Sequence, residues 1–208
     1  MTPEDTGNQV GPDAAPDLFT IGHSNLALDD FLGLLQQHGN QTVADVRTTP
    51  RSRWVPHFGA GPLREALSRR GIGYVPFGRE LGGRPQGGEF YDEQGHVLYG
   101  RLAGSPLFQA GIDRLLAGAQ TRRIALLCSE EDPCRCHRHL LIGRVLRDRG
   151  VAVSHIRRDG HIDTEAELAA REIDDAQPTL FAGGSGEEQW TSPRSVTRRN
   201  PPPSASEN

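Results

Sequence analysis

The residues with the clearest chemical potential lie in the stretch from Cys128 to Arg138, which reads Cys-Ser-Glu-Glu-Asp-Pro-Cys-Arg-Cys-His-Arg. The stretch follows an apolar run that predicts a buried strand, and it precedes an amphipathic segment that predicts a helix. A thiol beside a helix N-terminus and several arginines ionises more readily, as a nucleophile or a metal ligand requires. This loop is therefore the strongest candidate site.

One interpretation of the loop is thiol chemistry. Cys128 or Cys136 would attack an electrophile, His137 would transfer protons, and Glu130 would assist in the covalent or proton-transfer work. Arg138 would bind an anionic part of the substrate. We favour this interpretation slightly.

A second interpretation is a metal site, with Cys128, Cys134 and Cys136 joined by either His23 or His137. The Cys-x-Cys-His spacing is not the usual pattern of a zinc site, and we assign neither a metal nor a cofactor. In a third interpretation, Cys128 belongs to the core and the rest of the stretch is a solvated loop.

Two other strand ends carry polar residues. His23 and Ser24 follow the first predicted strand, and His23 is either a ligand or acid–base group or a structural hydrogen-bond partner. Asp45 and Arg47 end the second strand on one face, where Arg47 could hold a phosphate while Asp45 orients it. Alternatively, Asp45 and Arg47 form an internal ion pair. Ser24 and Ser52 complete the predicted substrate-binding set.

The elements that must position these residues follow from hydrophobic periodicity, with short apolar runs alternating with amphipathic segments. Predicted strands are 18–21, 42–46, 73–77, 124–127 and 151–156, and predicted helices are 28–38, 63–70, 107–116 and 138–149. The alternation predicts an α/β fold, a single three-layer domain with a mostly parallel sheet of about five strands. Such sheets bind ligands at the carboxyl ends of their strands. The glycine-rich stretch 78–100 is expected to be a long functional loop beside the site.

Composition sets the limits of the domain. The 208 residues are 35% hydrophobic, which supports one domain, at 18–175, between disordered tails at 1–17 and 176–208. The net charge of -4 argues neither for nor against nucleic acid. No apolar run is long enough for a membrane helix or signal peptide, and the three cysteines make a poor disulfide framework. We therefore expect a cytoplasmic protein without membrane contact.

The C-terminal tail contains an isolated apolar pair within Gln177-Pro178-Thr179-Leu180-Phe181. Gln177, Leu180 and Phe181 resemble the short Gln-x-x-Leu-Phe peptide by which bacterial polymerases and repair proteins dock on the replication sliding clamp. Clamp binding is one expectation, and a chance match or a segment packed on the domain is the other.

Several motifs together resemble the bacterial family known as domain of unknown function 488, from about Phe19 to Gly160. They are Thr20-Ile21-Gly22-His23-Ser24, Asp45-Val46-Arg47 with Pro50 and Ser52, Leu81-Gly82-Gly83, and Leu127-Cys128-Ser129-Glu130 with Cys136-His137-Arg138. The resemblance implies the fold and these site residues: His23, Asp45, Arg47, Cys128, Glu130, Cys136, His137 and Arg138. A more distant likeness is to rhodaneses, whose anion-binding loop differs from the acidic Glu130-Glu131-Asp132.

The leading functional expectation is an enzyme that acts on a nucleotide or a nucleic-acid lesion, as in DNA repair, and is tethered to the sliding clamp. One alternative is rhodanese-like sulfur transfer or another thiol reaction on a small molecule. The other is a non-catalytic metal-binding module.

Overall fold

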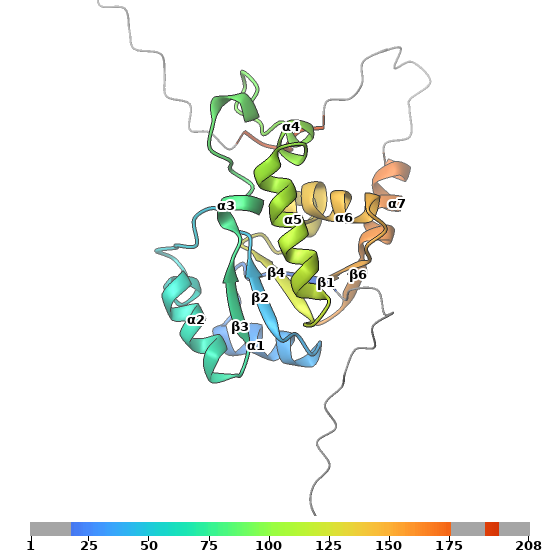
Figure 1. Ribbon diagram of the computed structural model, residues 1–208. Coiled ribbons are helices and arrows are strands. Elements are labelled where there is room, and N and C mark those ends of the chain that lie inside the picture. Colours follow the sequence, from blue (N-terminus) through green and yellow to red (C-terminus); the bar gives the residue numbers. More distant parts are fainter. Residues whose placement is uncertain (1–17, 176–189, 196–208) are drawn as a thin grey trace, which may run out of the picture.

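The computed structural model describes residues 18–175 and 190–195, which form an α/β domain around one sheet (Figure 1). Within these residues the strand order is β3-β2-β4-β1-β5-β6. The strands are β1 (Leu18–Gly22), β2 (Thr42–Asp45), β3 (Gly73–Pro76), β4 (Ile124–Cys128), β5 (Val153–Ile156) and β6 (Ile162–Thr164). The helices are α1 (Leu28–Gln37), α2 (Ala60–Arg69), α3 (Gly78–Leu81), α4 (Tyr99–Ala103), α5 (Pro106–Ala119), α6 (Arg144–Asp148) and α7 (Glu165–Asp175).

The predicted mostly parallel sheet is confirmed. Strand β4 is buried along its whole length and pairs in parallel with both β1 and β2, and β1 pairs in parallel with β5. A strand buried on both faces must be apolar throughout, which explains the uninterrupted run Ile124–Leu127. Strand β6 closes one edge antiparallel to β5.

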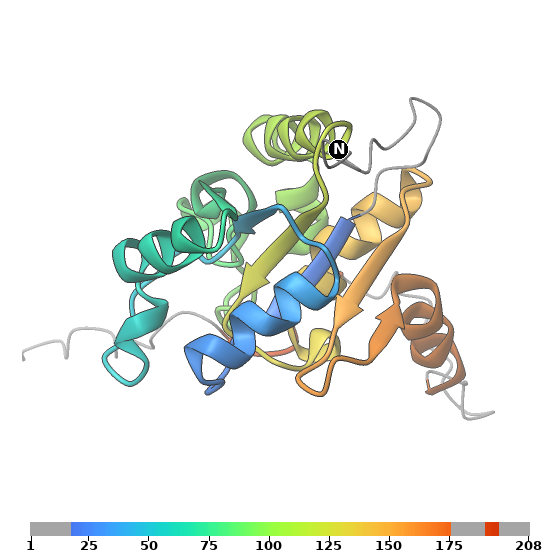
Figure 2. The same cartoon turned by 90° about the horizontal axis from the view of Figure 1, so that it is seen from below.

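Helices cover both faces of the sheet and give the predicted three layers (Figure 2). Phe31 and Leu35 of α1 pack with Leu67 of α2 in the core on one face. Phe108 and Ile112 of α5 pack with apolar residues of α6 on the other. These are the helical faces that the spacing of apolar residues predicts.

Several local features differ from the sequence expectation. The predicted helix 138–149 begins as a π-helix at Arg138–Gly143 and becomes α-helical only in α6. The expected loop 78–100 contains α3, a short 3₁₀ turn at Gly88–Phe90 and the start of α4. Strand β6 and helix α7 have no counterpart among the predicted elements, because β6 is very short and α7 contains more charged than apolar residues.

Part of the expected C-terminal tail is ordered on the domain. Thr191 forms an isolated β-bridge with Leu98, so residues 190–195 lie beside α4 (Figure 1). The expected tail 1–17 and the peptide Gln177–Phe181 lie outside the described residues. Among the helices that are described, none combines the length and apolar character that crossing a membrane requires.

Candidate active site

The candidate site lies where β1, β2 and β4 end, at the carboxyl edge of the sheet. Gly22 ends β1 against the loop that follows β4, and a Cβ on Gly22 would lie 1.7 Å from the backbone oxygen of Glu130. Only a glycine allows this close approach. The two loops are further joined by backbone hydrogen bonds from His23 to Cys128 and from Ser24 to Ser129.

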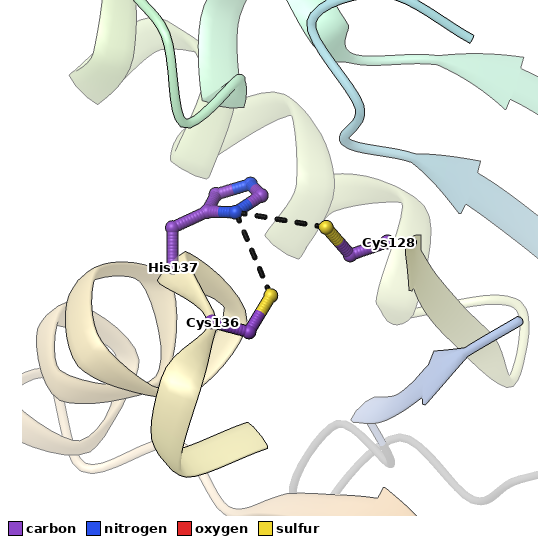
Figure 3. A group of neighbouring side chains, drawn as sticks. All are labelled: Cys128, Cys136 and His137. Atoms are coloured by element: carbon purple, nitrogen blue, oxygen red, sulfur yellow. Dashed lines mark hydrogen bonds between the residues drawn. The ribbon is translucent and has the colours of Figure 1, made fainter. Parts of the chain in front are cut away.

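Two thiols and an imidazole form the centre of the site (Figure 3). The Nδ1 atom of His137 lies 3.8 Å from Cys128 Sγ and 3.7 Å from Cys136 Sγ. Its Nε2 atom lies 3.3 Å from the backbone oxygen of Val46, which can only accept, so Nε2–H is the donor. With Nε2–H turned to Val46, Nδ1 of His137 faces both sulfurs, where it can accept a thiol proton or ligate a metal.

The two thiols have opposite tendencies to ionise. Burial raises the pKa of Cys136, but a hydrogen bond from Cys128 and the charges of Arg138 and His137 outweigh it and lower that pKa well below its usual value. For Cys128, the hydrogen bond to Cys136 and burial raise the pKa well above its usual value. Coupled acids this close lose their protons as a pair, and the geometry places the first negative charge on Cys136.

Arg138 supplies the buried charge that stabilises this thiolate. Its side chain is 0% exposed, and its Nε donates to Cys136 Sγ over 3.4 Å. Its other donors bind the hydroxyl of Thr20 and the backbone oxygens of Glu130 and Glu131, at 2.6 to 3.0 Å. Arg138 is therefore committed to the protein and does not line the cavity described below.

Buried hydrogen bonds extend from Arg138 to α7. Thr20 Oγ1 accepts from Arg138, and its hydroxyl donates to His155 Nδ1 over 2.8 Å, because burial lowers the pKa of His155 and its one N–H is the Nε2–H that faces Glu165. His155 Nε2–H then donates to Glu165 over 2.9 Å. Gly143 leaves room for Glu165, because a Cβ there would lie 2.2 Å from its carboxylate. These hydrogen bonds hold the Thr20 hydroxyl in place, and Thr20 in turn orients the side chain of Arg138.

Asp45 and Arg47 form the internal ion pair that was the alternative interpretation. Arg47 Nε and Nη2 donate to the two carboxylate oxygens of Asp45 over 2.8 and 2.6 Å, and Tyr74 also donates to Asp45. The Nη1 atom of Arg47 donates to the backbone oxygen of Phe58 and to His23. These bonds leave one Nη2 hydrogen of Arg47 without an acceptor among the described residues. Arg47 therefore lines the cavity but cannot hold a phosphate through two parallel hydrogen bonds.

His23 is a structural residue in this arrangement. Its Nε2 accepts from Arg47, its Nδ1–H donates to the backbone of Ser24, and its ring stacks on Phe58 at 4.3 Å between centroids. Burial, opposed by the Ser24 hydrogen bond and aided by the charge of Arg47, lowers the pKa of His23 to about 4. His23 is therefore neutral at pH 7, with both ring nitrogens engaged.

A cavity of about 640 Å³ opens over the thiols and the imidazole. Cys128, Cys136 and His137 line it together with Glu130, and Gly83 packs so closely on His137 that a Cβ would lie 2.9 Å from the ring. This contact gives a physical reason for Gly83 in the Leu81-Gly82-Gly83 motif, and a Cβ on Gly82 would lie 2.2 Å from the backbone oxygen of Gly78. The cavity is also lined by a set of arginines and one tyrosine: Arg47, Arg51, Arg84, Arg135, Arg194 and Tyr99.

The structure separates some predicted site residues from this cavity. Ser52 accepts from the backbone of Trp54 and Val55 in a local turn, and neither Ser52 nor Ser24 lines the cavity. Cys134 and His23 do not belong to the group of Cys128, Cys136 and His137, whose ligand atoms lie within 4.8 Å of one another. The four-ligand metal site is thus reduced to three candidate ligands.

Sequence reasoning missed one tyrosine and four arginines as individual members of the cavity lining: Arg51, Arg84, Tyr99, Arg135 and Arg194. Arg84 and Tyr99 belong to the stretch 78–100, which was expected to lie beside the site, so the signal was the length of that stretch. For Arg194 the signal was Trp190, a large aromatic residue in an otherwise polar tail.

Comparison with known families assigns the chain. The model of the family described as domain of unknown function DUF488 matches residues 27–145, more than half of the chain. The protein belongs to the DUF488 family. The DUF488 match includes Asp45, Arg47 and the loop from Cys128 to Arg138, and it ends before β5. No curated protein and no solved structure matches the chain.

Proposed function

We propose that this DUF488 protein is a thiol-dependent enzyme acting on a phosphate-bearing substrate, a nucleotide or a nucleic-acid lesion. The observation that carries the proposal is the position of Cys136 and His137 at the base of an arginine-lined cavity. The cavity volume suits a nucleotide, since small-molecule sites usually enclose about 300–1,000 Å³. Arginine is the side chain best suited to binding phosphate oxygens.

In this proposal Cys136 is the nucleophile and His137 is its general base. His137 Nδ1 accepts the proton of the Cys136 thiol, and Arg138 stabilises the thiolate that results. Cys136 then attacks an electrophilic atom of the substrate, and the leaving group departs with its electron pair and takes the proton from His137. Cys128 remains protonated and donates to Cys136, and exposed Glu130 is available for proton transfer at the mouth.

A direct test is to search for a covalent intermediate. The protein is incubated with nucleotides and with oligonucleotides carrying damaged bases, and intact-mass and peptide mass spectrometry locate any adduct. The proposal predicts an adduct on Cys136 that is absent from the Cys136→Ser variant, while Cys134→Ser retains it. A persulfide on Cys136 would instead indicate sulfur transfer, and unmodified Cys136 with every substrate would contradict the proposal.

The proposed tether to replication rests on the peptide with Gln177, Leu180 and Phe181. Calorimetric titration of the full-length protein into purified bacterial sliding clamp should show binding that is lost in Gln177→Ala and in Leu180→Ala/Phe181→Ala. Thr179→Ala is the matched control in the same peptide. Equal affinity of all four proteins, or no binding at all, would remove the tether from the proposal.

A metal-binding role is the second candidate, because Cys128, Cys136 and His137 bring three ligand atoms within 4.8 Å of one another beside an open cavity. A zinc ion held by two cysteines and one histidine keeps a fourth position for water or substrate. Elemental analysis of purified protein decides between the candidates. Stoichiometric zinc that disappears in Cys136→Ser would favour the metal role, and metal-free protein with a reactive thiol would favour the nucleophile.

A further inference from the structure

The segment from Trp190 to Ser195 is fastened to the domain through several independent contacts. The indole of Trp190 donates to the backbone oxygen of Leu140 over 2.8 Å, and its ring lies 4.3 Å from the guanidinium of Arg144. Ser192 is buried, and it exchanges hydrogen bonds with Val97 through its backbone N–H and its hydroxyl. A segment with this many contacts is part of the folded domain.

The same segment forms one wall of the candidate active site. Ser192, Pro193, Arg194 and Ser195 line the cavity that also contains the Cys136 thiol. The hydroxyl of Ser192 donates to the backbone oxygen of Arg194 and so shapes the turn that carries this arginine. Residues 190–195 lie beyond the DUF488 match, which ends at 145, so this wall is an addition to the matched region.

The cavity has a marked excess of positive charge. Arg51, Arg84, Arg135 and Arg194 line it, and none of their guanidinium groups hydrogen-bonds or ion-pairs with a described residue. Asp45 neutralises Arg47, and Glu130 is the one acidic residue among the described residues of the lining. The net charge of about +3 exceeds the charge of a single phosphate group, about -1.5 to -2 at pH 7.

We propose that residues 190–195 complete the cavity and that Arg194, with Arg51, Arg84 and Arg135, binds a substrate carrying at least two phosphate groups. Nucleoside diphosphates and triphosphates and short single-stranded oligonucleotides belong to this class. The inference rests on the proposed function in taking the ligand of this cavity as the substrate. Several guanidinium groups from separate loops can each contact a different phosphate.

The first experiment compares inorganic pyrophosphate with inorganic phosphate by calorimetric titration of the full-length, metal-free protein at fixed ionic strength. Pyrophosphate should bind at least about tenfold more tightly than phosphate. Arg194→Ala should weaken pyrophosphate binding about tenfold, and Arg194→Lys should recover part of the loss. The control is Arg122→Ala, which removes an exposed arginine at the opposite edge of the sheet. Equal binding of the two ions, or equal effects of Arg194→Ala and Arg122→Ala, would overturn the proposal.

The second experiment detaches the wall without touching its arginine. Trp190→Ala removes the indole hydrogen bond and the contact with Arg144, so it should weaken pyrophosphate binding as Arg194→Ala does. A chain that ends at Ser195 should bind like the full-length protein, and a chain that ends at Gln189 should lose the tenfold preference. Unchanged preference in the chain ending at Gln189 would show that residues 190–195 are not part of the site.

The pyrophosphate experiments test this inference separately from the proposed thiol chemistry. A reactive Cys136 combined with no preference for pyrophosphate would overturn this inference and leave the thiol enzyme standing. A clear pyrophosphate preference that depends on Arg194, combined with an inert Cys136, would do the reverse.

Discussion

The guanidinium of Arg138 is fully buried and lies beside the sulfur atom of Cys136. Its guanidinium donates hydrogen bonds to three oxygen atoms and to the Cys136 sulfur. The positive charge therefore favours the ionised form of this thiol. Burying a charge without partners would cost several kcal/mol, and here the oxygen acceptors offset that cost. Arg138 therefore favours the ionised form of the Cys136 thiol from within the protein, because it does not line the cavity.

The Arg138→Met variant should therefore lose both stability and thiol acidity. Removing the guanidinium leaves Thr20 and two backbone oxygens without donors, and we expect the free energy of unfolding to fall by about 3 kcal/mol or more. The pKa of Cys136 should rise in the same variant. Urea unfolding and alkylation against pH measure the two effects.

Arg135→Met is the matched control, since Arg135 is exposed and lies in the same loop. Its free energy of unfolding should change by no more than about 0.5 kcal/mol. Similar losses of stability in both variants would contradict the structural role of Arg138.

His23 should make stability depend on pH. Its pKa is about 4 in the folded protein and 6.5 in the unfolded chain, so between these values the unfolded chain binds more protons. Stability from this residue is complete above pH 6.5 and is lost as the pH falls toward 4, by about 2 kcal/mol between pH 7 and pH 5. Urea unfolding at the two pH values should show this loss, and His23→Asn should show a smaller one. An equal loss in both proteins would assign the pH dependence to other groups.

The sequence was sufficient to predict several residues of the site, but it did not show which hydrogen-bond acceptors surround them. Cys128, Cys136, His137 and Glu130 were predicted and do line one cavity. Arg47 and Arg138 were predicted to bind a substrate, yet a sequence shows a charge without showing which acceptors surround it. Whether an arginine is free depends on contacts between distant loops, and these are set by tertiary structure.

At the scale of elements, glycines allow the loops to meet. The end of β1 touches the loop after β4 at Gly22, whereas Gly33 lies in α1 with open space around its Cβ position. Gly22→Ala should lower the free energy of unfolding by about 1–3 kcal/mol through overpacking. Gly33→Ala should raise it by up to about 1 kcal/mol, because alanine favours the helix. Thermal unfolding compares them, and equal or reversed effects would contradict the described packing.

Periodicity predicted the elements that repeat over many residues and failed for those that tertiary contacts create. Helix α1 and strand β4 follow directly from their apolar spacing. The π-helix at Arg138–Gly143 has no such signal in the apolar spacing; in the structure Arg138 turns inward at its start and Glu165 packs against Gly143 at its end. Such π-helical segments often mark functional sites, which agrees with the position of this one.

At the scale of the whole molecule, segments distant in the sequence build one cavity. The loops after β2 and β4, the stretch after α3 and the segment 190–195 all contribute to its lining. The overall charge of -4 gives no sign of this basic cavity, because net charge reports a sum and not a distribution. The α/β fold could be predicted from the alternation of elements, but the cavity and the part that Arg194 plays in it required the structure.

Alkylation by iodoacetamide against pH most directly tests whether Cys136 is the thiol that ionises first. Peptide mass spectrometry follows each cysteine separately in metal-free protein, with urea-unfolded protein as the reference. We predict that Cys136 reaches half of its maximal rate well below the pH of the unfolded reference, and that His137→Asn moves this midpoint upward. Cys128 and Cys134 should titrate above the reference. A midpoint for Cys136 at or above that of the unfolded chain would contradict the account.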